Sequence, residues 1–160
     1  MNKPILIDTN ILIIILVGLI DPKLVPKTKE INIFEEKNYY ELMAFIENDL
    51  KNLLILPNIM TEVDNLLNKR FIGDYRWKYV IGFRKFLNET FEQYVNSITG
   101  AERYEFMKLG LTDSIILDVV LKNGGSLITG DSDLADEARA HSIKVLDFKG
   151  YRNEQIRKGS

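Results

Sequence analysis

Residues 4–13 read Pro-Ile-Leu-Ile-Asp-Thr-Asn-Ile-Leu-Ile, with a polar triplet between two apolar segments. A short, uninterrupted apolar segment such as 4–7 is typical of a strand that is covered on both faces. The triplet can cap a helix, which the apolar pattern continues to about Gly18. We therefore expect a buried strand that leads directly into a buried helix, with the Asp8 carboxylate at their junction.

Short apolar segments alternate with helical patterns along the rest of the chain. Strands are predicted at 53–56, 126–129 and 143–146 in addition to 4–7, and helices at about 39–50, 58–70, 75–95, 101–108, 113–122 and 131–141. This alternation predicts an α/β fold in which helices cover both faces of a parallel sheet. Ligands bind such sheets beyond the carboxyl ends of the strands, so Asp8 and Asp131 should lie on the same rim.

The chain has the length of one ordinary domain. We assign residues 1–150 to it, with residues 21–37, which contain two prolines among mixed charges, as an insertion loop. The charged residues 151–160 are expected to form a flexible tail. The longest apolar run, 11–20, is too short to cross a bilayer, and no small-residue cleavage site follows it. These features favour a cytoplasmic protein without a membrane partner.

The composition restricts the chemistry that this chain can perform. It has no cysteine, which excludes disulfides, thiolate metal sites and a cysteine nucleophile. His141 is the sole histidine, whereas a zinc site usually needs several nitrogen or sulfur ligands and a catalytic triad needs a histidine placed by other groups. Hydrolytic chemistry would therefore depend on carboxylates and a hard metal ion. The net charge of −2 provides no overall positive field to attract nucleic acid.

Asp113 is the acid whose position is best defined by helical geometry. At about 100° per residue, Ile116, Leu117 and Val120 lie within about 60° of it, so its side chain should point towards the core. A first-turn acid that only complements the helix dipole does not need to face inward, which favours a functional role. Asp118 lies about 140° away on the same helix and is expected at the surface.

Two acids follow the predicted strand at 126–129. Gly130 permits a close backbone approach at the strand exit, and helix capping explains one of Asp131 and Asp133 but not both. Two carboxylates in this arrangement at the end of a strand therefore indicate a cation site, with Asp131 as a direct ligand and Asp133 beside it.

Asp8 and Glu62 are more ambiguous on their own. A helix N-cap explains Asp8 as well as a functional role does. Glu62 lies near a helix start, at the margin of an apolar stripe made by Ile59, Val63 and Leu66, where a glutamate on the flank of the helix is the simpler interpretation. For both residues, the case for a site depends on the other acids.

Four motifs, taken in order, resemble those of the PIN-domain ribonucleases. They are Ile7-Asp8-Thr9-Asn10 after the first strand, Thr61-Glu62 early in a helix, Leu111-Thr112-Asp113-Ser114-Ile115-Ile116, and Thr129-Gly130-Asp131-Ser132-Asp133 after a late strand. No single motif is specific, but the ordered set covers nearly the whole chain. The resemblance implies a three-layer α/β/α fold, with a PIN-like parallel sheet of four or five strands flanked by helices.

The resemblance also implies a metal-dependent endoribonuclease that hydrolyses RNA phosphodiester bonds. In such an enzyme, one or two Mg²⁺ or Mn²⁺ ions would be held by four catalytic acids, Asp8, Glu62, Asp113 and Asp131, with Asp133 as an auxiliary metal ligand and Asn10 and Thr129 as supporting polar groups. Physical chemistry supports this set independently of the family. Two carboxylates about 5 Å apart repel each other by roughly 3 kcal/mol at an effective dielectric constant of about 20, so four such groups need a cation.

Two departures from the family pattern leave the subfamily open. The separation of Asp8 from Glu62 is longer than in the compact toxin members, and Gly130 stands where many members have asparagine. The chain fits the toxin of a toxin–antitoxin pair, which would have an antitoxin partner and form a homodimer, and it fits an RNA-processing nuclease as well.

Residues 69–86 are basic and aromatic, with six lysines or arginines against one aspartate. Basic side chains follow phosphates and aromatic rings stack on unpaired bases, so this segment is a candidate to bind single-stranded RNA through Arg70, Arg76 and Lys78. An amphipathic helix with its aromatic side chains in the core explains the same pattern equally well.

Two other functions fit parts of the pattern. An Asp-based phosphatase or phosphotransferase would use Asp8 as its nucleophile, but the haloacid-dehalogenase pattern has a second aspartate where this chain has Asn10. A catalytically inactive PIN-like module would use the acids as helix caps and bind RNA or a protein partner. Metal-dependent cleavage of RNA distinguishes the nuclease from both.

Overall fold

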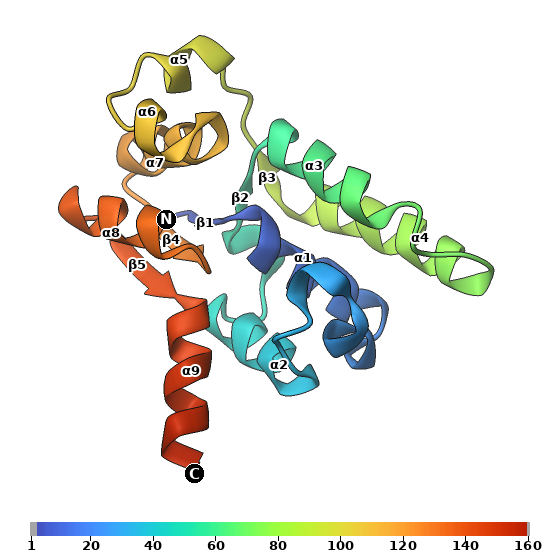
Figure 1. Cartoon of the computed structure of the whole chain (residues 1–160). Helices are drawn as coiled ribbons and strands as arrows, with labels where there is room; N and C mark the ends of the chain where they lie inside the picture. The colour runs from blue at the N-terminus through green and yellow to red at the C-terminus, as the bar shows by residue number, and fades with distance from the viewer. Residues whose placement is uncertain (1–2, 160) are drawn as a thin grey trace.

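Short parallel strands lie at the centre of the fold and helices surround them, as Figure 1 shows. The structure, a computed structural model, describes residues 3–159. Its strands are β1 (Ile5–Ile7), β2 (Leu54–Ile55), β3 (Phe91–Glu92), β4 (Ser126–Thr129) and β5 (Lys144–Asp147). The fold class is therefore α/β, as the alternation of apolar segments and helical patterns predicts.

The strands form two small parallel sheets. One has the order β1-β4-β5, and the other contains β2 and β3. An isolated parallel bridge joins Ile5 of β1 to Leu53, the residue before β2. Ile7 of β1 pairs with Ile128 of β4, so these two strands end side by side and the residues that follow them lie close together.

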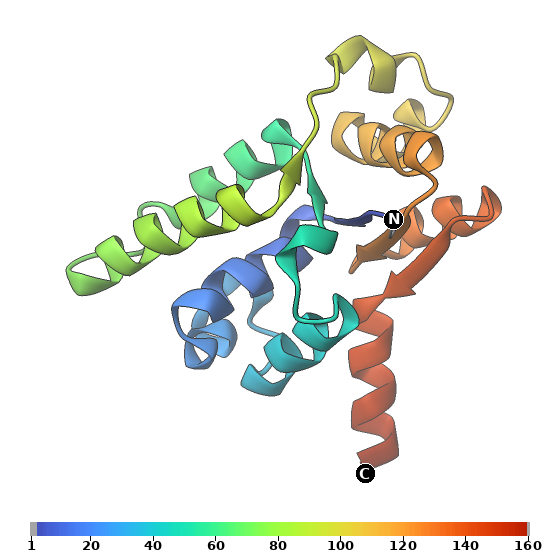
Figure 2. The same ribbon diagram turned by 180° about the vertical axis from the view of Figure 1, so that it is seen from behind.

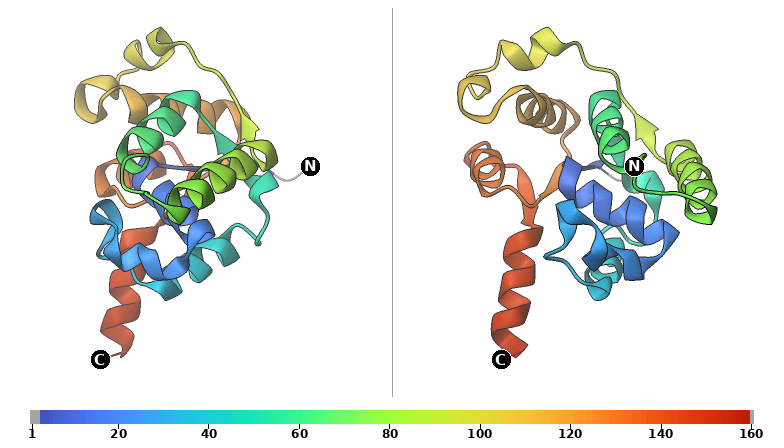
Figure 3. Two further views of the ribbon diagram at one scale, coloured as in Figure 1. Left: turned by 90° about the vertical axis from the view of Figure 1, so that its right-hand side faces the viewer. Right: turned by 45° about the vertical axis from the view of Figure 1, so that its right-hand side comes forward.

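Helices supply most of the regular structure. They are α1 (Thr9–Ile20), α2 (Glu36–Phe45), α3 (Pro57–Leu67), α4 (Asp74–Glu89), α5 (Ser97–Ala101), α6 (Phe106–Leu109), α7 (Leu111–Asn123), α8 (Ser132–Ala140) and α9 (Phe148–Gly159), with short 3₁₀ helices η1 (Pro22–Lys27), η2 (Lys29–Ile31) and η3 (Leu50–Asn52). The α3–α4 pair extends away from the sheets, and α9 extends in another direction (Figures 1 and 2). Helices α1 and α8 both pack against β4, and Figure 3 shows them on opposite sides of it.

Helix α1 is enclosed by the rest of the fold. Its residues 11–18 are all buried, and it packs against α2, α3 and α4. This burial explains why α1 has no polar side chain after Asn10, since no face of that part of the helix meets water. At Gly18, an added Cβ atom would lie 2.0 Å from the ring of Tyr39, so α2 packs directly on the α1 backbone. Among the described residues, no helix is both long and apolar enough to cross a membrane.

The insertion loop expected at residues 21–37 is instead built from short helices. η1 and η2 occupy most of it, and Val25, Ile31 and Phe34 are buried in the core. Pro22 lies in the first turn of η1, where its missing N–H group is not needed. The segment is therefore packed into the domain, because its apolar side chains are spaced to reach the core although its prolines and charges are typical of a loop.

The helix expected over residues 75–95 is shorter than predicted. It ends at Glu89, and the Thr90 hydroxyl donates a hydrogen bond to the carbonyl of Phe86 at 2.9 Å, which satisfies one of the last carbonyl groups. The chain then forms β3, which pairs with β2. A strand of two exposed residues carries no alternating pattern, so the sequence does not distinguish it from the end of an aromatic helix.

The flexible tail expected at residues 151–160 is helical as far as Gly159, and Ser160 lies outside the described residues. Helix α9 begins at Phe148, which is fully buried. The Phe148 ring stacks on the ring of Tyr151 at a centre-to-centre distance of 5.8 Å. One buried aromatic side chain thus attaches a helix whose remaining composition is largely charged.

Candidate functional site

Asp8 lies at the carboxyl end of β1, where the strand passes into α1. Its backbone N–H group donates to the carbonyl of Ile128 at 3.1 Å, which continues the pairing of β1 with β4. Its Oδ1 caps α1 by accepting from the N–H group of Ile11 at 3.3 Å. Its Oδ2 accepts from the N–H group of Gly130 at 3.3 Å and from the hydroxyl of Thr129. Groups on α1, on β4 and directly after β4 therefore fix this carboxylate, and Asp8 is only 8% exposed.

Burial raises the pKa of the Asp8 carboxyl above its ordinary value. The Thr129 hydroxyl and the N–H groups of Ile11 and Gly130 oppose the increase by donating to the carboxylate, while the charge of Asp131 adds to it. Asp131 acts on Asp8 because it follows β4, the strand beside β1. The two acids thus lie on one rim, as the strand-end rule predicts.

Asp131 caps α8 at the carboxyl end of β4. Its Oδ1 accepts from the N–H groups of Asp133 at 2.8 Å and Leu134 at 3.2 Å. Its own N–H group donates to the Thr129 hydroxyl at 3.0 Å, and that hydroxyl in turn donates to Asp8. Thr129 is fully buried, and its hydroxyl links the two acids.

Asp113 lies in the first turn of α7 and is half-buried. Burial raises the pKa of its carboxyl to about 7, and the charges of Asp131, Asp8 and Glu62 contribute to that increase. Charges act on one another in this way only when they are close together, because solvent and salt screen distant ones. Asp113 therefore belongs to the same group of acids and faces the interior, as its position on the helix predicts.

Glu62 lies in the second turn of α3 and is exposed. Its Oε2 accepts a hydrogen bond from the hydroxyl of Thr9 at 3.3 Å. This bond crosses from α3 to the start of α1 and holds the Glu62 side chain beside the residue that follows Asp8. Glu62 thus joins the group through a contact that its own helical pattern does not indicate.

The four acids line one cavity of about 800 Å³, which we call the acidic cavity. Asn10 also lines it, whereas Asp133 is outside its lining and contributes a backbone N–H group to Asp131. The acids come from the carboxyl ends of β1 and β4 and from the first two turns of α3 and α7. Carboxylate and amide oxygens are the ligands that these side chains offer, and oxygen ligands suit Mg²⁺ or Mn²⁺.

Glu30 is a fifth acid at the acidic cavity, and no sequence pattern predicts its position there. It lies in η2, within the segment expected to be a loop, and it forms an ion pair with Arg70 in the turn after α3. Its Oε2 is buried and has no hydrogen-bond partner among the described residues. No local pattern indicates a contact between side chains that are 40 positions apart in the chain.

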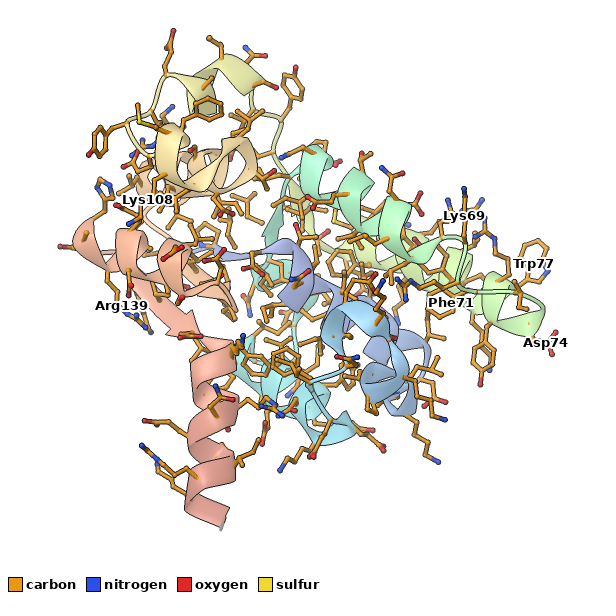
Figure 4. All side chains as sticks on the ribbon, in the orientation of Figure 1. Lys69, Phe71, Asp74, Trp77, Lys108 and Arg139 are labelled. Carbon is orange, nitrogen blue, oxygen red and sulfur yellow. The ribbon has the colours of Figure 1, made fainter. Side chains whose placement is uncertain are left out.

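A second group of side chains with metal-binding chemistry consists of Glu105, Glu137 and His141. Glu105 is buried, accepts hydrogen bonds from Arg103 at 3.1 and 3.2 Å, and has its Oε1 2.5 Å from the His141 Nε2. Lys108, labelled in Figure 4, pairs with Glu137 at 3.6 Å. Each carboxylate already has a basic partner, so this group is an ion-pair network that attaches the segment between α5 and α6 to α8.

Asp118 belongs to the same network, and the prediction that it lies at the surface is wrong. It is 6% exposed and forms ion pairs with Arg103 at 3.2 Å and with Lys122 at 2.7 Å. Helical geometry identifies one apolar stripe on α7, but α5 and α6 both pack against this helix as well. A polar residue that faces a second packed element is buried together with its ion-pair partners. The helical position of the residue alone does not reveal this.

The basic segment at residues 69–86 occupies the turn after α3 and most of α4. Figure 4 labels Lys69 and Trp77 in the part of this segment that lies farthest from the sheets. Its aromatic side chains divide between two environments, since Phe71 and Tyr79 are buried whereas Trp77 is 69% exposed. The amphipathic-helix interpretation therefore accounts for the buried rings and leaves Trp77 accessible.

The three cations expected to contact RNA all have partners within the protein. Arg70 pairs with Glu30 at the acidic cavity, and Arg76 donates to the backbone carbonyl and the side-chain oxygen of Asn68. Lys78 Nζ lies 5.3 Å from the centre of a neighbouring aromatic ring. All three side chains remain exposed, so these contacts are compatible with binding of a phosphate at the same surface.

The case for a functional site depends on this geometry and on the four motifs. The four catalytic candidates, Asp8, Glu62, Asp113 and Asp131, line one cavity although they are far apart in the chain. No protein-family model matches the chain, and no curated protein or solved structure shows a significant match to it.

Proposed function

We propose that this chain is a metal-dependent endoribonuclease of the PIN type, which hydrolyses phosphodiester bonds of single-stranded RNA at the acidic cavity. The observation that carries the proposal is the gathering of four carboxylates from separate segments around one cavity. Helix capping accounts for Asp8 and Asp131, but Asp113 and Glu62 cap no helix. A purely structural role for the group therefore leaves half of it unexplained.

The arrangement of strands supports the PIN-like part of the proposal. When the bridge between Ile5 and Leu53 is counted as continuing the sheet, the strand order becomes β3-β2-β1-β4-β5 with every pair parallel. β1 then lies in the middle, so Asp8 occupies the centre of the rim where ligands bind. Five parallel strands between helices correspond to the three-layer fold that the motifs imply.

A Mg²⁺ or Mn²⁺ ion would be held by carboxylate oxygens of Asp8, Asp113 and Asp131, with Glu62 beside them. Within the described part of the chain, no three of these acids have carboxylate oxygens within 4.8 Å of one another, so their side chains would have to draw together around the ion. When bound, such a cation acts as a Lewis acid on the phosphate and lowers the pKa of a water molecule that it contacts. The protein itself holds the ligands in place, because the Thr129 hydroxyl orients Asp8 and the first N–H groups of α8 orient Asp131. Asp113, whose pKa the neighbouring charges raise, would give up its proton to serve as a ligand when such a cation is bound.

The basic segment at residues 69–86 is the proposed RNA-binding surface. Arg70 connects this segment to the acidic cavity through Glu30, and Arg76, Lys78 and the exposed Trp77 offer further phosphate and base contacts. On the family resemblance, the setting would be cytoplasmic, either as the toxin of a toxin–antitoxin pair that forms a homodimer or as an RNA-processing nuclease.

Cleavage of a fluorescently labelled single-stranded RNA in Mn²⁺ tests the proposal. We expect Asp8→Asn and Asp113→Asn each to lower the cleavage rate by about 100-fold or more, since each removes a charged ligand of the cation. The matched control is Asp136→Asn, because Asp136 is a 73% exposed acid on α8 that does not line the acidic cavity. This control should retain wild-type activity.

These measurements distinguish a nuclease from an inactive binding module and from an Asp-based phosphotransferase. Retained cleavage in both Asp8→Asn and Asp113→Asn would remove the site assignment. Mn²⁺ binding without RNA cleavage by the wild-type protein would favour the inactive binding module. A burst of phosphorylated protein on addition of an acyl phosphate, lost in Asp8→Asn, would favour the Asp-based phosphotransferase.

A further inference from the structure

One basic side chain, Lys149, lies among the acids of the acidic cavity. It is the only lysine, arginine or histidine among the described residues that line this cavity, and five acids line it as well: Asp8, Glu30, Glu62, Asp113 and Asp131. The Lys149 side chain is exposed, and it takes part in no hydrogen bond or ion pair with residues 3–159. A lysine beside several acids that is paired with none of them is available to an incoming anion.

The backbone of Lys149 is held in a defined position at the rim. Its neighbour Phe148 is fully buried and stacks on Phe34 with ring centres 5.4 Å apart, and Phe34 itself lines the acidic cavity. The Cβ atom of Lys149 lies 3.9 Å from the point that a Cβ atom on Gly130 would occupy. Gly130 directly precedes Asp131, so the first turn of α9 lies next to the strand end that carries one of the acids.

The acids around the cavity make it an unfavourable place for an anionic substrate. A phosphodiester is an anion, and the carboxylates repel it wherever a cation does not offset them. The positive charge of Arg70 is already paired with Glu30. A lysine is a flexible point charge that commonly contacts phosphate, and Lys149 lines the cavity beside the acids.

We propose that Lys149 binds a non-bridging phosphate oxygen of the RNA strand that enters the acidic cavity. It is a substrate-binding residue of the proposed nuclease site, and the inference rests on the proposed function. Because the ammonium group contacts the anion and not the cation, it strengthens RNA binding without contributing to metal affinity.

Lys149→Gln, compared with Lys158→Gln, tests this role. Lys158 lies on the same helix, about 14 Å further along its axis, and is also exposed. Binding of a fluorescein-labelled single-stranded RNA is measured by anisotropy in Ca²⁺ over a series of salt concentrations, and cleavage of the same RNA is measured in Mn²⁺. Mn²⁺ affinity is measured separately by titration calorimetry.

We expect Lys149→Gln to weaken RNA binding and to raise KM by about tenfold, as for the loss of one hydrogen bond to a charged group. The slope of log K against log salt concentration should become shallower by about 0.7, which corresponds to the loss of one phosphate contact on a single strand. Lys149→Arg should restore most of the affinity, and Lys158→Gln should match the wild type. Mn²⁺ affinity should not fall in any of the three variants, because Lys149 is not a metal ligand.

Wild-type RNA affinity and salt dependence in Lys149→Gln, or an equal loss in Lys158→Gln, would overturn the inference. A loss of Mn²⁺ affinity in Lys149→Gln would also overturn it, because the lysine would then act on the metal ligands. If the wild-type protein cleaves no RNA, the proposed nuclease function fails separately, since the binding comparison in Ca²⁺ still decides whether Lys149 contacts RNA.

Discussion

Ionisation of Asp113, which lies among other acids, lowers the stability of the folded protein. Burial and the charges of Asp131, Asp8 and Glu62 raise the pKa of its carboxyl to about 7, well above the value of 3.8 for an isolated aspartate. The folded protein therefore holds this proton more tightly than the unfolded chain does. The resulting stabilisation is fully present below the ordinary pKa of aspartate and is lost as the pH rises through about 7.

We therefore expect Asp113→Asn to stabilise the metal-free protein at pH 8, and to stabilise it by less than half as much at pH 5. The gain should be about 1–2 kcal/mol, since solvent screening reduces the effect for a carboxyl that is only partly buried. Urea unfolding of the wild type and the variant in EDTA at both pH values measures it. An equal gain at pH 5 and pH 8 would show that ionisation of Asp113 is not its source.

Thr129 is the residue that connects two acids of the cavity. Its hydroxyl donates to Asp8 and accepts from the N–H group of Asp131. Thr129→Val keeps the shape of the side chain but removes the hydrogen bond that each partner makes with the hydroxyl, which should destabilise the protein by about 1–3 kcal/mol. It should also lower Mn²⁺ affinity about 10-fold to 100-fold, because Asp8 loses one of the groups that orient it.

Thr129→Ser is the control for this change, because serine keeps the hydroxyl. Urea unfolding and Mn²⁺ titration should give values near wild type for the serine variant and lower ones for the valine variant. If the valine variant binds Mn²⁺ as the wild type does, Thr129 has only a structural role.

At the scale of the elements, the packing of α2 on α1 depends on Gly18. A Cβ atom there would lie 2.0 Å from the Cδ2 atom of Tyr39. Gly18→Ala should therefore destabilise the protein by about 1–3 kcal/mol, even though alanine is favoured over glycine by about 1 kcal/mol within a helix. Urea unfolding gives the free energy of unfolding for this comparison.

Gly82 provides the matched control for this prediction. It also lies inside a helix, α4, but an added Cβ atom there would meet nothing within 4 Å. Gly82→Ala should therefore stabilise the protein by about 0.5–1 kcal/mol through helix propensity. If both alanine variants are stabilised, the contact between Tyr39 and α1 is looser than the structure indicates.

The elements that the sequence predicts well are those with a strong local pattern. β1, β4 and β5 lie within one or two residues of the predicted strands, because each contains consecutive apolar residues between polar residues or turn signals. The sequence does not predict β3 or α9, because each depends on a distant partner. β3 forms by pairing with β2, and α9 is attached by the rings that pack on Phe148. Local periodicity does not carry information of that kind.

At the scale of the whole molecule, the sequence predicts the candidate site only where strand order or helical geometry determines the position of a side chain. The strand-end rule brings Asp8 and Asp131 together, and helical geometry turns Asp113 inward. The sequence does not indicate Glu30, which lies in the segment predicted to be a loop, or Lys149, which lies between the last predicted strand and the predicted tail. Their contribution follows from packing of buried side chains far from any motif.

The four acids come from positions spread over most of the chain, so a bound cation should stabilise the fold as a whole. A ligand that binds only the folded state adds about 2.7 kcal/mol when its concentration is about 100 times Kd. We expect Mn²⁺ to raise the midpoint of thermal unfolding, and to raise it more at pH 8 than at pH 6. The pH dependence follows because the cation must displace the proton from Asp113, whose pKa is about 7.

Asp8→Asn and Asp113→Asn should each abolish most of this stabilisation, while Asp136→Asn, outside the cavity, should keep it. The shift should be absent with the same concentration of Na⁺, because a monovalent ion offsets too little of the clustered charge. A Mn²⁺-dependent increase that survives in both cavity variants would mean that the cation binds elsewhere on the molecule. In that case the cluster of acids would be a structural feature, and its unfavourable charge in the folded state would have no bound ligand to explain it.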